Sequence, residues 1–283
     1  MKKQSKIGNI LAYIVIILLL VLIMFPLIYT LLGAFKTNSE FLAHPETIFP
    51  KNPTFENFIT AWNSDSLNIK QMTWNSTYYT VLCVIASMLF SSMGGYVFAR
   101  GEFPGKKVWF LIFSSLMFIN LGSITVYPLF DILSLIGLNK SLWGLIVVKC
   151  FGIQIVNIYL VRSYIRTIPK EIDEAAQIDG CSFIRTFFSI HVPIIKPILA
   201  TIGILGFQAS WNEYLMPTIF TITNPSQRTL TVGIIALKNS GDVAANWPLM
   251  LAGASISLLP VLVAFAIGNK YFMSGLTSGA VKG

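Results

Sequence analysis

Long stretches without charge dominate this sequence. About 20 mostly apolar residues, rising about 1.5 Å each, are needed to cross the hydrocarbon core of a bilayer as a helix. Uncharged runs of at least that length occupy residues 7–35, 71–99, 108–130 and 243–269. Two more runs, 141–161 and 197–227, are interrupted by a single charge each, Lys149 and Glu213. With 54% hydrophobic and 11% charged residues, the chain lacks the polar surface of a soluble domain. We therefore predict an all-α integral membrane protein.

These runs predict six transmembrane helices in a single transmembrane domain that covers residues 1–283. The expected spans are about 8–35, 75–99, 108–130, 141–162, 197–222 and 247–269. The first run is longer than the apolar region of about 7–15 residues in a secretory signal, so we interpret it as an uncleaved span. Residues 36–74 contain several prolines and asparagines and are expected to form a surface loop or small cap.

The distribution of positive charge predicts the orientation of these spans. The formal net charge is +8, which in a soluble protein would suggest nucleic acid, but here the placement of the charges is more informative. Cytoplasmic segments of membrane proteins carry an excess of Lys and Arg. With a cytoplasmic N-terminus, few of the 20 lysines and arginines face outward, namely Lys36, Lys51, Lys70, Lys140, Arg228 and Lys238. Both termini are therefore expected in the cytoplasm of a multi-pass protein, and nucleic acid is not expected as a partner.

The cytoplasmic loop at residues 163–196, between the fourth and fifth spans, has the pattern of two short helices. Pro169 suits the first turn of the first helix, and Gly180 suits the position just after its end. Ser182 can cap the second helix, which Pro193 and Pro197 then end before the fifth span. The second helix has an apolar stripe at helical spacing, formed by Phe183, Phe187 and Ile190.

The first of these helices combines acidic and small residues, which favours contact with a protein. Alanines allow close approach of a partner backbone, and carboxylates can pair with charges across an interface. An amphipathic helix lying on lipid is the alternative, but such a helix prefers a basic polar face. The segment that carries this pattern consists of Glu174, Ala175, Ala176, Gln177, Ile178, Asp179 and Gly180.

The same residues resemble a known family, the inner-membrane components of binding-protein-dependent ABC importers. The family's cytoplasmic signature is a Glu-Ala-Ala run, an Asp-Gly pair and a downstream proline. It matches Glu174-Ala175-Ala176, Asp179-Gly180 and Pro193 here. In that family this loop holds the coupling helix, which sits in a cleft of the ATPase subunit. Cys181 departs from the pattern, since the family often has alanine at this position. Because the volume of cysteine is close to that of alanine, we still expect the loop to couple to the ATPase.

The resemblance covers nearly the whole chain and narrows to the carbohydrate branch, the maltose-type second permease. It includes Asn75-Ser76, residues 96–100 and 103–107, Trp211-Asn212-Glu213, and the closing residues 275–283. The resemblance implies that this small, glycine-rich tail lies on the same side of the membrane as the ATPase. Composition alone would make it a frayed chain end.

The resemblance also implies the partners and the mechanism. These are a second homologous permease subunit, two ATPase subunits and an extracellular solute-binding protein, which together import an oligosaccharide across a bacterial-type cytoplasmic membrane by alternating access. The sequence contains no G-x-x-x-x-G-K-[ST] phosphate loop, so ATP and Mg are expected in the separate ATPase. The three cysteines and two histidines show no metal-ligand or catalytic spacing, so we expect no enzyme activity and no cofactor in this chain.

Polar groups inside the spans are candidates for the substrate pathway, because ionisable residues are costly in hydrocarbon. Lys149 could face the pathway and pair with Glu213 or with an anionic substrate, or it could be a structural charge at a partner interface. A second group mixes an aromatic face with hydrogen-bonding side chains, as sugar sites do, or marks the interfacial aromatic belt. It consists of Gln208, Trp211, Asn212, Glu213 and Tyr214. Asn120, Gln154 and Asn157 are expected to form hydrogen bonds between helices.

Two alternative functions remain open from the sequence. The first keeps the class and changes the cargo to another polar or anionic solute such as glycerol phosphate, which Lys149 allows. The second is an ion-coupled secondary transporter, which would need a carboxylate relay in the membrane. Glu213 and Asp131 are the carboxylates available for such a relay, and this function leaves the 163–196 loop unexplained.

Overall fold

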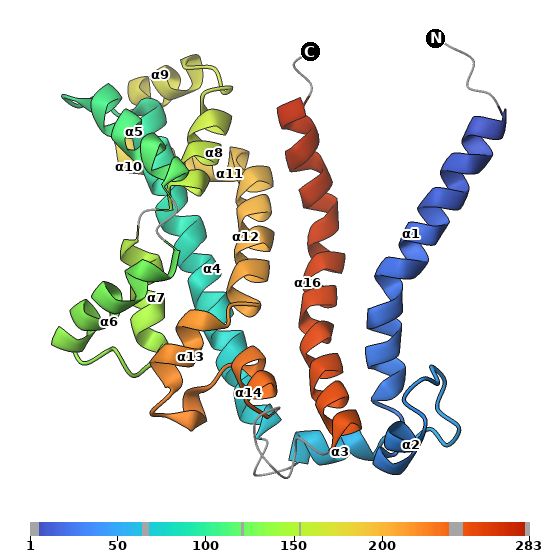
Figure 1. Ribbon diagram of the computed structural model, residues 1–283. Coiled ribbons are helices and arrows are strands. Elements are labelled where there is room, and N and C mark those ends of the chain that lie inside the picture. Colours follow the sequence, from blue (N-terminus) through green and yellow to red (C-terminus); the bar gives the residue numbers. More distant parts are fainter. Residues whose placement is uncertain (1–5, 64–67, 120–121, 153, 238–245, 281–283) are drawn as a thin grey trace. The chain divides into compact units, whose positions relative to one another are not determined.

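The computed structural model describes residues 6–63, 68–119, 122–152, 154–237 and 246–280, and all regular structure within these ranges is helical (Figure 1). Two compact units share the chain: Met1–Lys70 with Gly233–Leu259, and Gln71–Val232 with Pro260–Gly283. The helices α14 (Leu230–Leu237) and α16 (Trp247–Ala280) contribute residues to both units, as do the first two residues of α4 (Ile69–Arg100). The last three residues of the C-terminal tail, 281–283, lie outside the described part of the chain.

The first unit begins with the apolar helix α1 (Lys6–Gly33) and continues with two short helices, α2 (Asn38–Ala43) and α3 (Glu56–Asn63). The hydroxyl oxygen of Thr37 accepts a hydrogen bond from the Glu40 amide at 3.3 Å and so caps α2. Figure 1 shows α3 lying crosswise to α1 at the end where α1 finishes. The segment expected to be a loop or cap therefore contains two helices.

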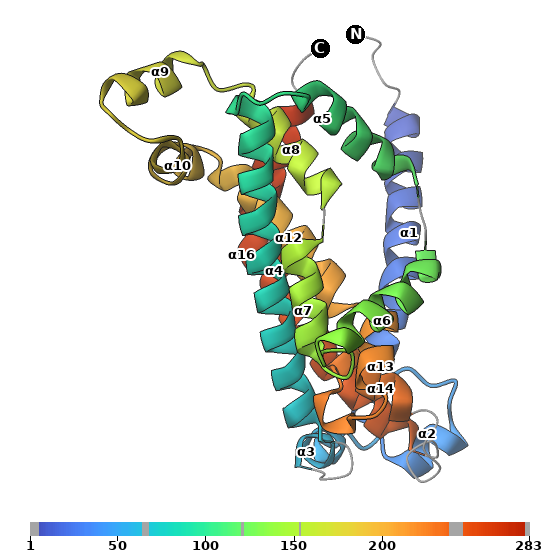
Figure 2. The same ribbon diagram turned by 90° about the vertical axis from the view of Figure 1, so that its left-hand side faces the viewer.

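The second unit is arranged around α4 (Ile69–Arg100), which reaches from one end of the unit to the other (Figure 2). The helices that follow along the chain are α5 (Lys106–Ser115), η1 (Leu116–Phe118), η2 (Gly122–Thr125), α6 (Val126–Leu135), α7 (Leu142–Phe151) and α8 (Ile155–Ile165). After them come α9 (Glu171–Ile178), α10 (Phe183–Thr186), the π-helix η3 (Phe187–His191), α11 (Val192–Ile194), α12 (Lys196–Trp211), α13 (Leu215–Thr221) and η4 (Pro225–Gln227).

The described residues contain four helices that are long and apolar enough to cross a bilayer. They are Gly8–Gly33, Ile69–Arg100, Leu142–Ile165 and Trp247–Gly268. A fifth candidate is the pair Phe183–Ile194 and Lys196–Trp211, which is bent by 78°. The structure thus confirms an all-helical membrane protein and shows four or five candidate spans of the six expected.

The third expected span, residues 108–130, is not one continuous helix. Ile119 has an extended backbone (φ −100°, ψ 103°), and Gly122 adopts a left-handed φ of +52°. Neither conformation can continue an α-helix, so the apolar run is divided between α5 and α6. Uncharged composition predicted the length of this run but could not show the interruption.

The fifth expected span, residues 197–222, is also interrupted, between α12 and α13. Pro217 has no backbone N–H to donate to the carbonyl of Glu213, so a continuous helix through this point would lose a hydrogen bond. Side chains also donate to carbonyls at the end of α12. Asn212 Nδ2 donates to the Gln208 carbonyl at 3.0 Å, and Thr231 Oγ1 donates to the Trp211 carbonyl at 2.9 Å.

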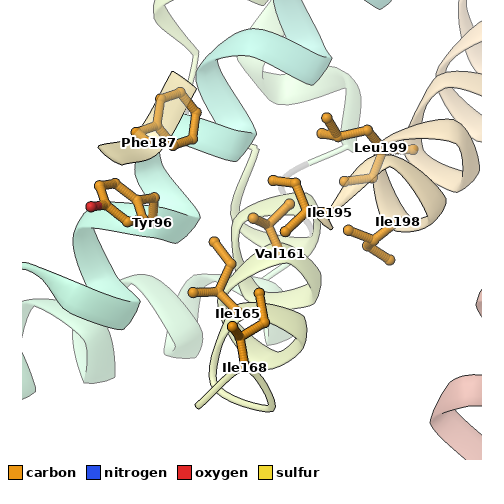
Figure 3. Close-up of a cluster of buried hydrophobic side chains, with 9 residues drawn as sticks. Tyr96, Val161, Ile165, Ile168, Phe187, Ile195, Ile198 and Leu199 are labelled. Atoms are coloured by element: carbon orange, nitrogen blue, oxygen red, sulfur yellow. The ribbon is translucent and has the colours of Figure 1, made fainter. Parts of the chain in front are cut away.

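A buried apolar cluster in the second unit joins α4, α8 and the segment that enters α12 (Figure 3). Tyr96 supplies the contribution of α4, and Figure 3 shows Val161 of α8 close to Ile195, which lies between α11 and α12. The other members are Ile168, Phe187, Ile198, Leu199 and Ile202. Because residues on both sides of the 163–196 loop belong to one cluster, the two ends of that loop are packed together.

The close contact of α4 with α8 makes the size of residue 95 critical. A Cβ atom on Gly95 would lie 2.6 Å from Val161 Cβ, whereas one on Gly206 would have its nearest neighbour, Val84 Cγ2, at 3.7 Å. We expect Gly95→Ala to lower stability by about 1–3 kcal/mol through overpacking. The matched control Gly206→Ala also replaces a helical glycine, which favours the helix by about 1 kcal/mol, but introduces no clash. Thermal denaturation in detergent measures both, and equal midpoints would contradict the packing described here.

Candidate functional site

The acidic helix of the 163–196 loop, α9, has well-defined ends. Its first turn carries Glu171, Asp173 and Glu174, close to the positive end of the helix dipole. At its other end the Cys181 amide donates to the Ala176 carbonyl at 2.9 Å, and the Gly180 amide donates to the Gln177 carbonyl at 3.0 Å. These two bonds form a Schellman motif, and Gly180 has the left-handed φ of +75° that the motif requires.

The sequence prediction for this helix was therefore right at its end and slightly wrong at its start. Gly180 terminates α9 as expected. Pro169, however, lies two residues before the first helical residue, Glu171, rather than inside the first turn. Lys170 is the N-cap, and its carbonyl accepts the first hydrogen bonds, from the amides of Asp173 at 2.9 Å and Glu174 at 3.1 Å.

The second helix of the loop is capped as predicted but is not a regular α-helix. The Ser182 hydroxyl accepts a hydrogen bond from the Arg185 amide at 3.3 Å. After one turn the chain becomes the π-helix η3, whose wider turns change which residues face inward. Phe187 is buried, Phe183 is partly exposed, and His191 is fully buried. The expected stripe of Phe183, Phe187 and Ile190 is thus replaced by an inner face that includes His191.

The surface of α9 presents most of the signature residues to solvent. Ala176 is buried and packs the helix against its own chain. The exposed residues of the signature are Glu174, Ala175, Asp179, Gly180 and Pro193. Ile178 is the most exposed apolar side chain of this helix, at 87%, and the sequence pattern predicted no separate role for it. Figure 2 shows α9 and α10 standing out to one side of α4 in the second unit.

A groove of about 830 Å³ runs between α9 and the Arg100 end of α4. Charged side chains of both signs line it, among them Arg100, Glu102, Lys106, Lys170 and Glu174. Lys106 Nζ donates to the Gly101 carbonyl at 2.7 Å. Partial burial lowers the pKa of Lys106 below its usual value, and the positive charge of Arg162 acts in the same direction.

A buried charged junction fixes α9 to the rest of the second unit. Arg100 Nε donates to Asp173 Oδ2 at 2.8 Å, and Arg100 Nη2 donates to the Ile168 carbonyl at 2.6 Å. The other carboxylate oxygen, Asp173 Oδ1, lies 2.6 Å from His191 Nε2. The side chains of Arg100, Asp173 and His191 are only 8%, 13% and 0% exposed, so water screens their interactions little.

The remaining nitrogen of His191 indicates how this junction is protonated. Nδ1 is buried and has no hydrogen-bond partner in the described part of the chain. A proton there would be an unsatisfied buried donor, so the geometry favours the tautomer that carries its proton on Nε2 and donates it to Asp173. The ring of Tyr96 packs on His191 with centroids 4.8 Å apart and covers the junction.

Sequence reasoning missed this junction. The acidic character of the first loop helix did not single out Asp173, and the spacing of the histidines predicted no metal-ligand or catalytic role for His191. Their positions differ by 18 and those of Arg100 and Asp173 by 73, so only folding brings the three side chains together. The available signal was a histidine in the apolar stripe of the second helix of the loop.

The candidates for the substrate pathway are spread over two environments. Trp211 is 2% exposed, and its ring stacks on Phe207 at 5.6 Å with an 11° angle between planes. Glu213 is half-buried, and its Oε2 accepts a hydrogen bond from the buried Tyr79 hydroxyl at 2.9 Å. The exposed members of the group are Gln208, Asn212 and Tyr214.

Lys149 is half-buried near the end of α7, and no ion pair joins it to Glu213 among the described residues. Its backbone carbonyl accepts a hydrogen bond from Gln154 Nε2 at 3.1 Å, across the point where α7 ends. Asn157 Nδ2 donates to Ser87 Oγ of α4 at 3.1 Å and to Gln154 Oε1 at 3.1 Å. The expected role of Gln154 and Asn157 as interhelical hydrogen-bonding groups is confirmed. Asn120 lies outside the described residues.

The fold and the site together define a class of protein: a multi-pass helical membrane protein with a structured acidic loop. Residues 107–271 match the model of a protein family described as the binding-protein-dependent transport system inner membrane component. The chain belongs to this family. It is the transmembrane permease component of an ABC transporter and not the ATPase, and it is a multi-pass protein of the inner membrane.

Relatives that match more than nine-tenths of the chain agree with this assignment. A probable ABC transporter permease protein of Bacillus subtilis, YurM, is 33% identical over 282 residues, which cover 100% of this chain and 91% of the relative. The galactooligosaccharides transport system permease protein GanQ of the same organism is 31% identical, covering 100% and 99%. The arabinooligosaccharides transport system permease protein AraQ of Halalkalibacterium halodurans is 32% identical, covering 92% and 91%. The resemblance seen in the sequence is thus confirmed.

A solved structure shows the same fold. It is a crystal structure of a bacterial ABC transporter involved in the import of the acidic polysaccharide alginate. The match has a TM-score of 0.82 and covers 96% of this chain and 99% of that one, with 22% sequence identity. At this identity the likeness concerns the fold alone.

Removing the carboxylate of Asp173 is expected to release α9. In Asp173→Asn, the buried Arg100 loses its counter-charge, and breaking such a pair costs about 3–5 kcal/mol. The expected result is a lower thermal midpoint and faster tryptic cleavage in the loop, at Lys170 or Arg185. Glu171→Gln is the matched control, because it removes a carboxylate from the same turn of α9 where the side chain is exposed. Equal cleavage rates for the two variants would show that the junction does not hold the loop.

Proposed function

We propose that this chain is one of two homologous permease subunits of an importer that carries an oligosaccharide across a bacterial cytoplasmic membrane. An extracellular binding protein delivers the sugar, and two ATPase subunits with their ATP and Mg drive its passage. Family membership implies the ATPase and the binding protein as partners. The names of GanQ and AraQ, matched over more than nine-tenths of their length, support an oligosaccharide as cargo.

In this proposal the chain crosses the membrane six times as one domain. The segments α5 and α6 together form the third crossing, and α12 with α13 forms the fifth. Interrupted helices inside membranes are tolerated where protein covers the break. The side-chain hydrogen bonds to the Gln208 and Trp211 carbonyls support such cover at the second of these breaks. The excess of Lys and Arg on the side of the 163–196 loop supports cytoplasmic termini.

The observation that carries the proposal is the exposed face of α9. Glu174, Ala175 and Asp179 form a small acidic surface on a helix whose inner side, at Ala176 and Asp173, is fixed to the chain. We assign this helix as the coupling helix that enters the cleft of the ATPase. Closure of the ATPase pair would move α9, and the junction at Asp173 would pass that movement to α4 and to the segment leading into α12. Alternating access follows from this transmission.

The substrate pathway is assigned to the polar side chains near the breaks of α7 and α12. Gln208, Asn212 and Tyr214 are exposed and can donate and accept hydrogen bonds with sugar hydroxyls. Glu213 belongs to this group through its bond with Tyr79. The buried ring of Trp211 has no exposed face in the described conformation, so its stacking on a sugar requires α12 or α13 to move.

A second cargo within the same class is favoured by Lys149. It carries a positive charge inside a predicted span without an ion-pair partner among the described residues, and such a charge is costly unless something balances it. An anionic solute such as glycerol phosphate, or an acidic sugar, would provide that balance.

The coupling role predicts a specific loss of transport. Glu174→Ala removes an exposed charge of the partner surface, and Gly180→Ala forces alanine into a left-handed backbone at about 1–2 kcal/mol. No heavy atom would lie within 4 Å of the new Cβ of residue 180, so the effect acts through the backbone. Both variants are expected to remain in the membrane and lose sugar uptake and co-purification of the ATPase, while Glu171→Gln keeps both. Normal uptake by both variants would refute the coupling role.

The role of Lys149 is tested by Lys149→Met, which keeps a long side chain without charge. If the ammonium faces the pathway, uptake of an acidic solute should fall more than uptake of a neutral oligosaccharide, because only the acidic solute loses a counter-charge. Rates of uptake measured in proteoliposomes with each solute report the difference. Unchanged affinity and rate for both would place Lys149 outside the pathway.

A further inference from the structure

The short helix α3 in the first unit has three faces that differ in chemistry. The side facing the protein carries Ala61, which is fully buried, and the partly buried Asn57 and Phe58. A second face is polar and exposed and carries Glu56, Thr60 and Asn63. The third face is apolar and exposed and consists of Phe55, Ile59 and Trp62, at 66%, 59% and 42% exposure. Residues spaced by four and three positions lie along one side of a helix, so these three form a continuous stripe.

The position of α3 is fixed by direct bonds to the end of α1. Asn57 Nδ2 donates to the carbonyls of Ala34 and Lys36, both at 2.8 Å. The Phe35 ring packs against Phe58 and Phe55, with centroids 5.0 and 5.1 Å apart. Residues 34–36 directly follow Gly33, where the first candidate span ends. The helix α3 is therefore held at the level where α1 leaves the hydrocarbon.

A buried lysine holds the chain around α2 against the end of α1. Lys36 is completely buried, and its Nζ donates to the hydroxyl of Thr47 at 2.8 Å and to the Thr47 carbonyl. The ammonium also lies 5.8 Å from the centre of the Phe41 ring. These contacts tie the chain on both sides of α2 to the end of α1. On the other side of α3 the next candidate span begins at Ile69, so the chain returns to the membrane soon after α3 ends.

We propose that α3 lies in the interface of the bilayer, with Phe55, Ile59 and Trp62 inserted at the boundary between lipid headgroups and acyl chains. Aromatic residues, tryptophan above all, concentrate at that depth, and a helix with an apolar and a polar face lies in the plane of the interface. The stripe contains no charge, and its polar neighbours are on the face toward water. The proposal depends on the membrane location of the chain and not on its cargo or its coupling.

Lipid fits this stripe better than a docked protein because α3 lies at the level of the membrane surface. A patch for the external binding protein would have to stand clear of the membrane, whereas α3 is bonded within three residues of the end of α1. The interfacial stripe would fix the depth and tilt of α1, whose side chains from Ile10 to Phe25 are exposed and face lipid or another subunit.

Site-directed spin labelling in the assembled transporter, reconstituted in phosphatidylethanolamine and phosphatidylglycerol vesicles, tests this placement. The variants Ile59→Cys and Thr60→Cys are labelled in a chain in which Cys83, Cys150 and Cys181 are replaced by serine. Collision rates with oxygen, which partitions into lipid, and with a water-soluble nickel complex are compared. We expect the oxygen-to-nickel ratio to exceed one at residue 59 and to fall below one at residue 60.

A second pair, Trp62→Cys and Asn63→Cys, repeats the comparison in case one substitution impairs assembly. Preference for the nickel complex at both residues 59 and 62 would overturn the proposal, since the stripe would then face water. Protection from both reagents, or protection that arises only when the external binding protein is added, would also overturn it in favour of a protein contact. Preference for oxygen at both positions, with and without the binding protein, supports it.

Discussion

The need to pair every backbone N–H and C=O group in hydrocarbon governs this structure. Helices meet the need internally, which is why the regular structure of the described residues is helical. Where a helix stops, side chains take over. Gln154 bonds the Lys149 carbonyl beyond the end of α7, and Thr231 bonds the Trp211 carbonyl at the end of α12. The polar groups near the proposed substrate pathway therefore have a structural role as well as a proposed functional one.

At the 163–196 loop the dominant interaction is of a different kind. Arg100, Asp173 and His191 bring charged and polar groups out of water, and their mutual bonds offset the cost of burial. The junction gives α9 two distinct sides. Its inner side is bonded to α4 and η3, and its outer side carries Glu174, Ala175 and Asp179. The proposed coupling role needs both sides, since α9 would receive force from the ATPase on the outer side and pass it inward through the other.

Family membership and the geometry of this loop support each other but answer different questions. The matched relatives and the solved fold identify the kind of machine to which the chain belongs. The bonds around Asp173 suggest how a push on α9 reaches the spans. The bonds of the α2–α3 segment to the end of α1 suggest, independently, how the interfacial placement proposed for α3 would fix the depth of α1.

The sequence by itself determined the elements whose causes are local. Apolar runs predicted a helical membrane protein, and Gly180 and Ser182 marked the end of α9 and the start of α10, because a left-handed glycine and a capping hydroxyl act on neighbouring residues. Only the tertiary structure decided how the third and fifth apolar runs divide into shorter helices and which polar residues are buried. The π-helix turns His191 inward to meet Asp173, and Asp173 meets Arg100 from a distant helix. Such contacts depend on how whole helices pack against one another. The pattern of residues along one helix carries no information about that packing.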